Sequence, residues 1–299
     1  MPPFHAPYLA LNAFVAPARP RPELWRTLMG VVLLGIFGFL VSQAVFFSLI
    51  AALGPQGARA AVIELATGAS PASVIALLFS YLPLTIGLAL GLALMMRRGL
   101  FSLTGPVGPA FRAFLLVGLP LTGLWLILLP LSTLSKDVIP HLTVWQQLPW
   151  LPLAVLGLFV QTGTEELMFR GYLQQQLAVR FRSAWGWMVL PSVLFGLVHY
   201  SPQQYGAVAA LVVLWSGLFG LAAADLTART GNLGAAVGLH FANNASAVLM
   251  VGFKGNVGGL ALYNSMIDPA DVSGVVLYFG IDTVALAISW LAARVLLRV

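Results

Sequence analysis

Residues 28–53, LMGVVLLGIFGFLVSQAVFFSLIAAL, decide the class of fold. The stretch carries no charged side chain, and it is longer than the roughly 20 apolar residues that cross about 30 Å of hydrocarbon as a helix. Backbone N–H and C=O groups in lipid must hydrogen-bond within their own segment, so a helix is predicted here rather than an open strand. This stretch alone indicates a membrane protein.

The composition of the whole chain agrees with that interpretation. It is 60% hydrophobic and 8% charged, against about 25% charged residues in an average soluble domain. Further apolar stretches follow, separated by Pro and Gly. We predict an all-α polytopic protein with about eight transmembrane helices, forming one transmembrane domain over residues 1–299. The predicted spans are 28–53, 73–96, 111–134, 148–180, 185–201, 206–228, 232–252 and 272–297.

Basic residues in the short loops predict the orientation. An even number of spans places both termini on one side, and eleven basic residues then share that side. The positive-inside rule makes that side cytoplasmic. The net charge of +6 therefore reflects membrane topology, and no nucleic-acid partner is expected. We expect an integral protein of a bacterial inner membrane with both termini cytoplasmic. The inner set is Arg19, Arg21, Arg26, Arg97, Arg98, Arg112, Arg180, Arg182, Arg229, Arg294 and Arg298, and the outer set is Arg59, Lys136 and Lys254.

Charged residues inside the fourth span are candidates for function, because charge is costly in a bilayer. The segment 164–173 reads TEELMFRGYL. Glu166 and Arg170 are four residues apart and lie on one helical face, so they can pair. Glu165 is rotated about 140° from Arg170 and is free to face another helix as a general base. The alternative is that all three residues form one structural ion network.

Two histidines fall in or near later spans. His199 closes FGLVH at 195–199, and His240 opens HFANN, with Asn244 four residues on and on the same face. A lone histidine in a span is more often a hydrogen-bond partner between helices than a catalyst. Two histidines together with a free carboxylate favour catalysis. His5 and His141 are assigned no role.

The chain geometry can bring these residues together. The midpoint between Glu165 and His199 is position 182, within the basic segment 180–182, so a hairpin turning there puts both at one depth. The polar stretch 174–176 is then expected to project about 10 Å into the cytoplasm. His240 lies about nine residues beyond the turn at 231–232, roughly 13 Å of helix. All three side chains are predicted to meet in the cytoplasmic half of the bilayer, with Glu165 facing His199.

The three motifs resemble those of the CAAX-protease/bacteriocin-processing (CPBP) family of membrane proteins, which includes type II CAAX prenyl endopeptidases. That family carries EExxxR, FxxxH and HxxxN on successive core helices, and here they occur in that order within residues 145–250. The resemblance implies that Glu165, helped by His199, activates a water for attack on a peptide bond. It also implies that His240 and Asn244 stabilise the oxyanion, and that Glu166 and Arg170 orient the site.

Cofactor and substrate are less constrained. Glu165, His199 and His240 would make a possible zinc set, but a metal-free reaction is favoured because Asn244 is a poor zinc ligand and no HExxH occurs. The expected partners are the lipid bilayer and a protein or peptide substrate, lipidated or not. Some members of the family act as scaffolds, so the motifs do not prove catalysis.

Other functions fit the sequence less well. Ser216 lacks the GxSG of rhomboid-type serine proteases, and Asp282 lacks the GxGD of presenilin-type aspartyl proteases. Asp282 and Asp225 are expected to be capped or water-facing carboxylates. The alternative from another class is a non-enzymatic transporter, immunity or scaffold protein that uses the same buried polar cluster. Against a transporter, no repeat relates the two halves of the chain.

Overall fold

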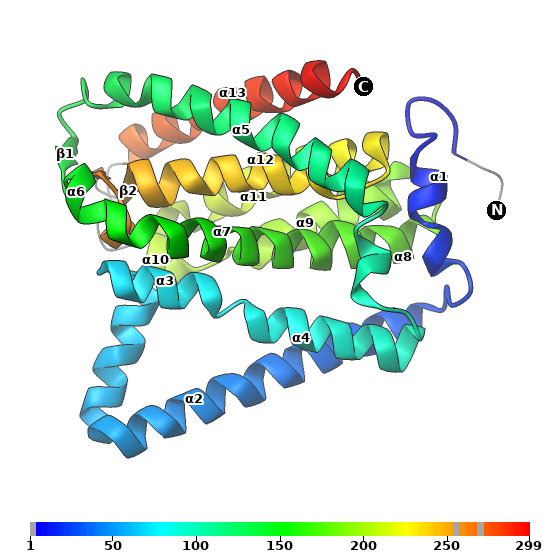
Figure 1. Cartoon of the computed structure of the whole chain (residues 1–299), viewed down its shortest axis with the longest axis horizontal. Helices are drawn as coiled ribbons and strands as arrows, with labels where there is room; N and C mark the ends of the chain where they lie inside the picture. The colour runs from blue at the N-terminus through cyan, green and yellow to red at the C-terminus, as the bar shows by residue number, and fades with distance from the viewer. Residues whose placement is uncertain (1–3, 254–256, 268–271) are drawn as a thin grey trace.

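Helices account for most of the computed structural model, which describes residues 4–253, 257–267 and 272–299 (Figure 1). Five helices are long and apolar enough to cross a membrane: Leu24–Thr67, Pro71–Met96, Val107–Ser132, Pro202–Thr230 and Ser273–Leu297. The other three predicted spans are also helical but are shorter or more polar. The predicted class is confirmed, and the chain is an integral membrane protein. Lys254, predicted to be an outer basic residue, lies outside the described residues.

The elements follow one another along the chain as a helical bundle with a small sheet at one end. In order they are α1 (Leu11–Phe14), η1 (Ala16–Ala18), α2 (Leu24–Thr67), α3 (Pro71–Phe79), α4 (Leu82–Gly91), η2 (Leu92–Met96), η3 (Leu100–Leu103), α5 (Val107–Ser132), β1 (Val138–Pro140), α6 (Val144–Gln147), η4 (Leu148–Trp150), α7 (Leu151–Glu166), η5 (Leu167–Gln174), α8 (Gln175–Ala178), η6 (Trp185–Val189), α9 (Leu190–Leu197), α10 (Pro202–Tyr205), η7 (Gly206–Val208), α11 (Ala209–Thr230), α12 (Gly234–Ala245), η8 (Ser246–Met250), β2 (Val251–Phe253), η9 (Gly258–Leu260), β3 (Tyr263–Ser265) and α13 (Val272–Leu297).

Helix α2 extends beyond the predicted span and bends into a V (Figure 1). The first predicted span ends at residue 53, but helix resumes at Pro55 and continues to Thr67. Gly54 has φ 72° and ψ 170°, a conformation that glycine adopts at little cost. Pro55 then begins the second arm, where the missing N–H of proline is tolerated. The predicted loop is therefore a second helical arm.

The second predicted span is divided between α3 and α4. The helix is interrupted at Ser80 and Tyr81. Pro83 lies in the first turn of α4, and its ring would clash with the carbonyl of Phe79 if the helix continued unbroken. Tyr81 lies at this interruption, and its phenol faces the carboxylate of Glu165 on α7.

Helix α12 forms the centre of the bundle, between α5, α7 and α11 (Figure 1). Every residue from Gly234 to His240 is buried. Helix α5 approaches so closely that a Cβ at Gly234 would overlap the carbonyl of Ala110, and a Cβ at Gly238 would lie 2.8 Å from the Phe114 carbonyl oxygen. Glycine at these positions lets α12 sit deep in the protein, where its polar side chains face other helices.

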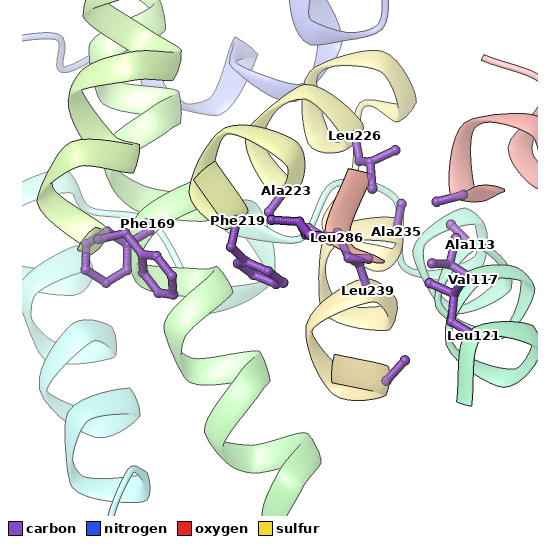
Figure 2. Close-up of a cluster of buried hydrophobic side chains, with 14 residues drawn as sticks. Ala113, Val117, Leu121, Phe169, Phe219, Ala223, Leu226, Ala235, Leu239 and Leu286 are labelled. Atoms are coloured by element: carbon purple, nitrogen blue, oxygen red, sulfur yellow. The ribbon is translucent and has the colours of Figure 1, made fainter. Parts of the chain in front are cut away.

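A hydrophobic cluster of buried side chains joins α12 to five other elements, namely α5, η5, α9, α11 and α13. Figure 2 shows Val117 and Leu121 of α5, Phe219 of α11, Leu239 of α12 and Leu286 of α13, with Phe169 of η5 at the opposite end of the view. Each of these side chains is at most 7% exposed. The cluster fixes α12 between its neighbours and sets the depth of the polar residues on its other face.

The predicted hairpin between the fourth and fifth spans is present. The chain runs through α7, η5 and α8, turns at residues 179–184, and returns through η6 and α9. Phe169 and Phe195 make an edge-to-face contact across it, with centroids 5.0 Å apart. Glu165 and His199 are each four residues from one of these rings, so they belong to the same level of the antiparallel pair.

The side chains of the polar stretch after the motif are buried within the protein, and its projection beyond the bilayer stays a prediction. Gln174, Gln175 and Gln176 are each at most 2% exposed. Gln174 donates to the Ala224 carbonyl at 3.0 Å, and Gln175 accepts from Arg98 at 2.7 Å. Burial lowers the pKa of the Arg98 guanidinium to about 10. These amides serve as hydrogen-bond partners for neighbouring segments.

A small sheet that was not predicted lies at one end of the bundle, and the capped carboxylate of Asp225 lies at the other. A three-stranded sheet has the order β1–β3–β2, with β1 antiparallel and β2 parallel to β3. At the opposite end, Asp225 of α11 accepts hydrogen bonds from Tyr8 at 2.9 Å and from the Trp290 indole at 2.9 Å, and forms an ion pair with Arg229 at 2.8 Å. Asp225 is thus capped and ties the N-terminal segment and α13 to α11.

Candidate functional site

Glu166 is the most completely buried carboxylate of the site. It is 0% exposed, and its Oε1 accepts from Arg170 Nη1 at 2.9 Å. The predicted Glu166–Arg170 pair is confirmed. The same oxygen lies 2.8 Å from Nδ1 of His240 on α12, a contact that the sequence analysis did not foresee. Glu166 thereby joins two helices through one carboxylate.

Glu165 also faces α12. Its Oε1 accepts from Gln161 Nε2 at 2.8 Å, and its Oε2 lies 3.6 Å from His240 Nε2. The sequence pattern predicts that Glu165 faces His199. Among the residues that the structure describes, no ion pair joins them, and the imidazole within ion-pair distance of Glu165 is that of His240. Helical phase excluded Arg170 as its partner but could not choose between two imidazoles on other helices.

The hydrogen bonds of His240 determine which ring nitrogen carries a proton. The Glu166 oxygen already accepts from the Arg170 guanidinium, so it acts toward Nδ1 as an acceptor. Nδ1 therefore donates, and Nε2 points toward Glu165. The ring packs against Phe219 at a centroid distance of 4.8 Å and Phe195 at 6.0 Å. Hydrogen bonding and packing together leave His240 one orientation.

His199 lies at the end of α9 and is half-buried. Its Nδ1 is 2.7 Å from the Phe195 carbonyl oxygen. A carbonyl only accepts, so Nδ1 donates, and a neutral His199 carries its lone pair on Nε2. The ring contacts Phe195 at 4.7 Å, and that phenyl ring separates it from Arg170, whose guanidinium lies 4.4 Å over the same ring.

An amide links Glu165 to the last predicted catalytic residue. Asn244 Nδ2 donates to Gln161 Oε1 at 2.8 Å, and Gln161 in turn donates to Glu165. Gln161 is 7% exposed and lies one turn before Glu165 on α7. It was missed in the sequence analysis, although a glutamine four residues before a candidate carboxylate in an apolar helix was a usable signal.

The N-terminal half of the chain supplies a further contact. The phenol of Tyr81, at the interruption between α3 and α4, faces the carboxylate of Glu165, and Tyr205 lies near it. Thr85, one turn further along, lies 2.6 Å from Thr164 hydroxyl to hydroxyl and holds α4 against α7. Tyr81 was also missed, because no local pattern relates it to a residue 84 positions away.

The possible zinc set is Glu165, His199 and His240. Within residues 4–253, 257–267 and 272–299, no three His, Asp or Glu side chains converge as a metal ion requires. His240 turns one ring nitrogen to each glutamate, and His199 Nδ1 is taken by a backbone carbonyl. The Nδ1 hydrogen bonds leave Nε2 of each histidine as the nitrogen that a metal would bind. The metal-free reaction stays a prediction, and the steps proposed below use protein groups alone.

Other candidate residues lie elsewhere. Ser216 is buried in α11. Asp282 of α13 lines a small cavity with Asn243 and Ser289. The backbone N–H of His141 donates to Leu262 beside the small sheet, and His5 precedes α1 in the N-terminal segment.

The fold and the site define a helical membrane protein with two adjacent buried glutamates, two histidines and an asparagine on three helices. Residues 146–246 match the family model described as type II CAAX prenyl endopeptidase Rce1-like. This segment, about a third of the chain, contains all six predicted site residues, and the resemblance is confirmed for it.

One curated protein shows a similar partial likeness. The chain is 30% identical over 115 residues to YyaK of Bacillus subtilis strain 168, described as an uncharacterized protein. The match covers 37% of this chain and 37% of that protein. No solved structure matches the chain. The family description implies a protease, and the rest of the functional argument depends on the geometry.

Proposed function

We propose that the protein is an intramembrane endopeptidase that hydrolyses a peptide bond of a membrane-associated protein or peptide. The observation that carries this proposal is the meeting of Glu165, His240 and the Gln161–Asn244 amide pair between α7 and α12. A carboxylate, an imidazole and a primary amide are the groups that activate water and bind an oxyanion in hydrolysis. The Rce1-like segment that contains them supports the same reaction class.

Charge balance suggests the resting state of the site. Two carboxylates and the Arg170 guanidinium, all buried, leave one negative charge. In the proposed reaction His240 donates from both ring nitrogens, so it acts as an imidazolium whose charge offsets that negative charge. Its Nδ1–H is held by Glu166 at 2.8 Å, so its Nε2–H is the donor available to a reacting oxygen. Glu165 remains ionised and accepts protons.

The reaction follows from these roles. Glu165 takes a proton from a water molecule while the water oxygen bonds to the peptide carbonyl carbon. The carbonyl oxygen becomes an oxyanion and accepts hydrogen bonds from His240 Nε2–H and the second Nδ2 hydrogen of Asn244. The C–N bond then breaks, and Glu165 returns the proton to the leaving amine. Preorganised donors of this kind each contribute roughly 10²- to 10³-fold to turnover.

The remaining residues orient or assist. Glu166 and Arg170 hold His240 in its donating orientation. The Nδ1–H of His199 is fixed on the Phe195 carbonyl, and in this proposal its Nε2 assists the transfer of the water proton. Both termini are placed in the cytoplasm, since most basic residues of the loops then lie on that side.

The test compares membrane proteomes of cells carrying the wild-type protein or Glu165→Gln. New protein termini that are present with the wild type and absent with the variant would identify substrates. Equal sets of termini, at equal amounts of folded protein, would contradict proteolysis. If the cells nevertheless lost a transport or immunity phenotype, that result would favour the non-enzymatic alternative.

A further inference from the structure

The side-chain amide of Gln161 contacts both the proposed general base, Glu165, and the proposed oxyanion donor, Asn244. It donates to Glu165 Oε1 at 2.8 Å on its own helix and accepts from Asn244 Nδ2 at 2.8 Å on α12. Gln161 is nearly fully buried. Its position is outside all three motifs of the sequence analysis.

The charge of Glu165 determines the direction of these hydrogen bonds. An ionised carboxylate only accepts, so Gln161 must turn its NH₂ group toward Glu165 and its oxygen toward α12. That oxygen in turn requires the NH₂ group of Asn244. The Asn244 oxygen then accepts from Asn243 Nδ2 at 3.2 Å. Three amides therefore point their donors in one direction, toward Glu165.

The direction matters for the proposed oxyanion donor. An amide side chain presents either an NH₂ group or an oxygen of nearly the same size, and a rotation of 180° about its last bond exchanges them. An oxygen facing the reacting centre would repel the oxyanion that the NH₂ group stabilises. Gln161 removes this choice, because only one orientation of Asn244 satisfies its carbonyl oxygen.

We propose that Gln161 is a positioning residue that couples the base to the oxyanion donor by fixing the amide orientation of Asn244. The effect on turnover rests on the proposed function. The hydrogen-bonded bridge from Glu165 through Gln161 to Asn244 is itself a structural feature. Gln161 supplies no atom to the reaction. Its effect passes through Asn244, while Glu165 fixes the orientation of the Gln161 amide.

The first experiment measures turnover of a quenched-fluorescence peptide carrying a cleavage site found in the proteome comparison. Gln161→Met keeps the side-chain volume and removes both hydrogen bonds. We expect kcat to fall about 10- to 100-fold, in line with the cost of misplacing a catalytic group, with KM within about twofold. The matched control is Gln174→Met. It removes the hydrogen bond of another buried side-chain amide on the same continuous helix and should leave kcat unchanged.

A double-mutant cycle separates positioning from general damage. If Gln161 acts through Asn244, adding Gln161→Met to Asn244→Ala should lower kcat by no more than about twofold beyond Asn244→Ala alone. A multiplied loss would show that Gln161 acts independently of Asn244 and would overturn the proposal, as would an unchanged kcat in Gln161→Met.

Unfolding measurements test the Glu165–Gln161–Asn244 bridge independently of catalytic activity. The shifts in the unfolding midpoint of Gln161→Met and Asn244→Leu, measured in detergent micelles, should add to more than the shift of the double variant. Simple additivity would refute the bridge itself. Coupled stability in a protein that cleaves nothing would leave the bridge standing and reject the proposed function.

Discussion

Substituting each of the two adjacent glutamates with glutamine should have different effects. Glu165→Gln should mainly abolish turnover, whereas Glu166→Gln should mainly lower stability. Glu165→Gln and Glu166→Gln each exchange one carboxylate oxygen for an NH₂ group at neighbouring positions of the same helix. In Glu166→Gln the buried Arg170 loses its counter-ion, and the Nδ1–H of His240 loses an ionised acceptor. In Glu165→Gln the remaining side-chain oxygen can still accept from Gln161.

The expected costs follow from burial. Breaking a buried ion pair by removing one partner costs about 3–5 kcal/mol, because the other charge stays buried without compensation. Glu166 and Arg170 are 0% and 1% exposed, so the full range applies to Glu166→Gln. Glu165→Gln weakens one charge-assisted hydrogen bond and removes one buried charge, so its net cost should be roughly 1 kcal/mol. Its turnover should fall by about 10²- to 10⁴-fold, the contribution of a general base.

The assay is equilibrium unfolding of both purified variants in mixed detergent micelles, followed by tryptophan fluorescence, alongside turnover of the same peptide. Glu165→Gln should unfold near the wild-type midpoint and be inactive, whereas Glu166→Gln should unfold markedly earlier. Equal destabilisation by the two substitutions would refute the division of roles between the glutamates. A Glu166→Gln variant as stable as the wild type would show that the Glu166–Arg170 ion pair contributes little to stability.

Three further outcomes are expected. Tyr81→Phe should lower kcat/KM about tenfold by removing a hydroxyl that faces Glu165, while Tyr200→Phe, at an exposed position, should have no effect on the same assay. Asp225→Asn should lower the unfolding free energy by about 3 kcal/mol, because Arg229 loses its partner, and limited proteolysis should then cut residues 4–22 faster. Chelator treatment should leave peptide cleavage unchanged, and loss of cleavage that zinc restores would contradict the metal-free mechanism.

The fold was predictable wherever a single helix carried the information. Apolar length located the spans, and the turn near 182 followed from basic residues between two of them. The Glu166–Arg170 pair followed from a spacing of four residues, and it forms even though the helix is wound as the π-helical segment η5 directly after Glu166. Spacing rules work here because both partners lie on one element.

Contacts between elements were not predictable in the same way. Hairpin arithmetic placed Glu165 and His199 at one level, but a level does not determine the direction of a side chain, and Glu165 turned to α12. The partners of the glutamines at 174–176 also lie on other elements, and buried amides are stable when carbonyls or guanidinium groups meet them.

The small sheet and the second arm of α2 were missed for another reason. Three-residue strands carry too little pattern to be recognised, and β1 pairs with a strand more than 120 residues away. In α2, the Gly54–Pro55 pair was taken as a stop signal. Glycine with positive φ followed by proline also permits a sharp bend between two helices, and sequence alone does not separate the two outcomes.

The site is not complete within the Rce1-like segment. Residues 146–246 hold the glutamates, histidines and amides, yet Tyr81 comes from the α3–α4 interruption and Thr85 holds that region against Thr164. Helix α5, also outside the segment, supports α12 through the close approach of Ala110 to Gly234. A carboxylate on α7 and its donors on α12 keep their separation only while both helices are held from outside. Selection on the N-terminal half should therefore act on packing and on Tyr81.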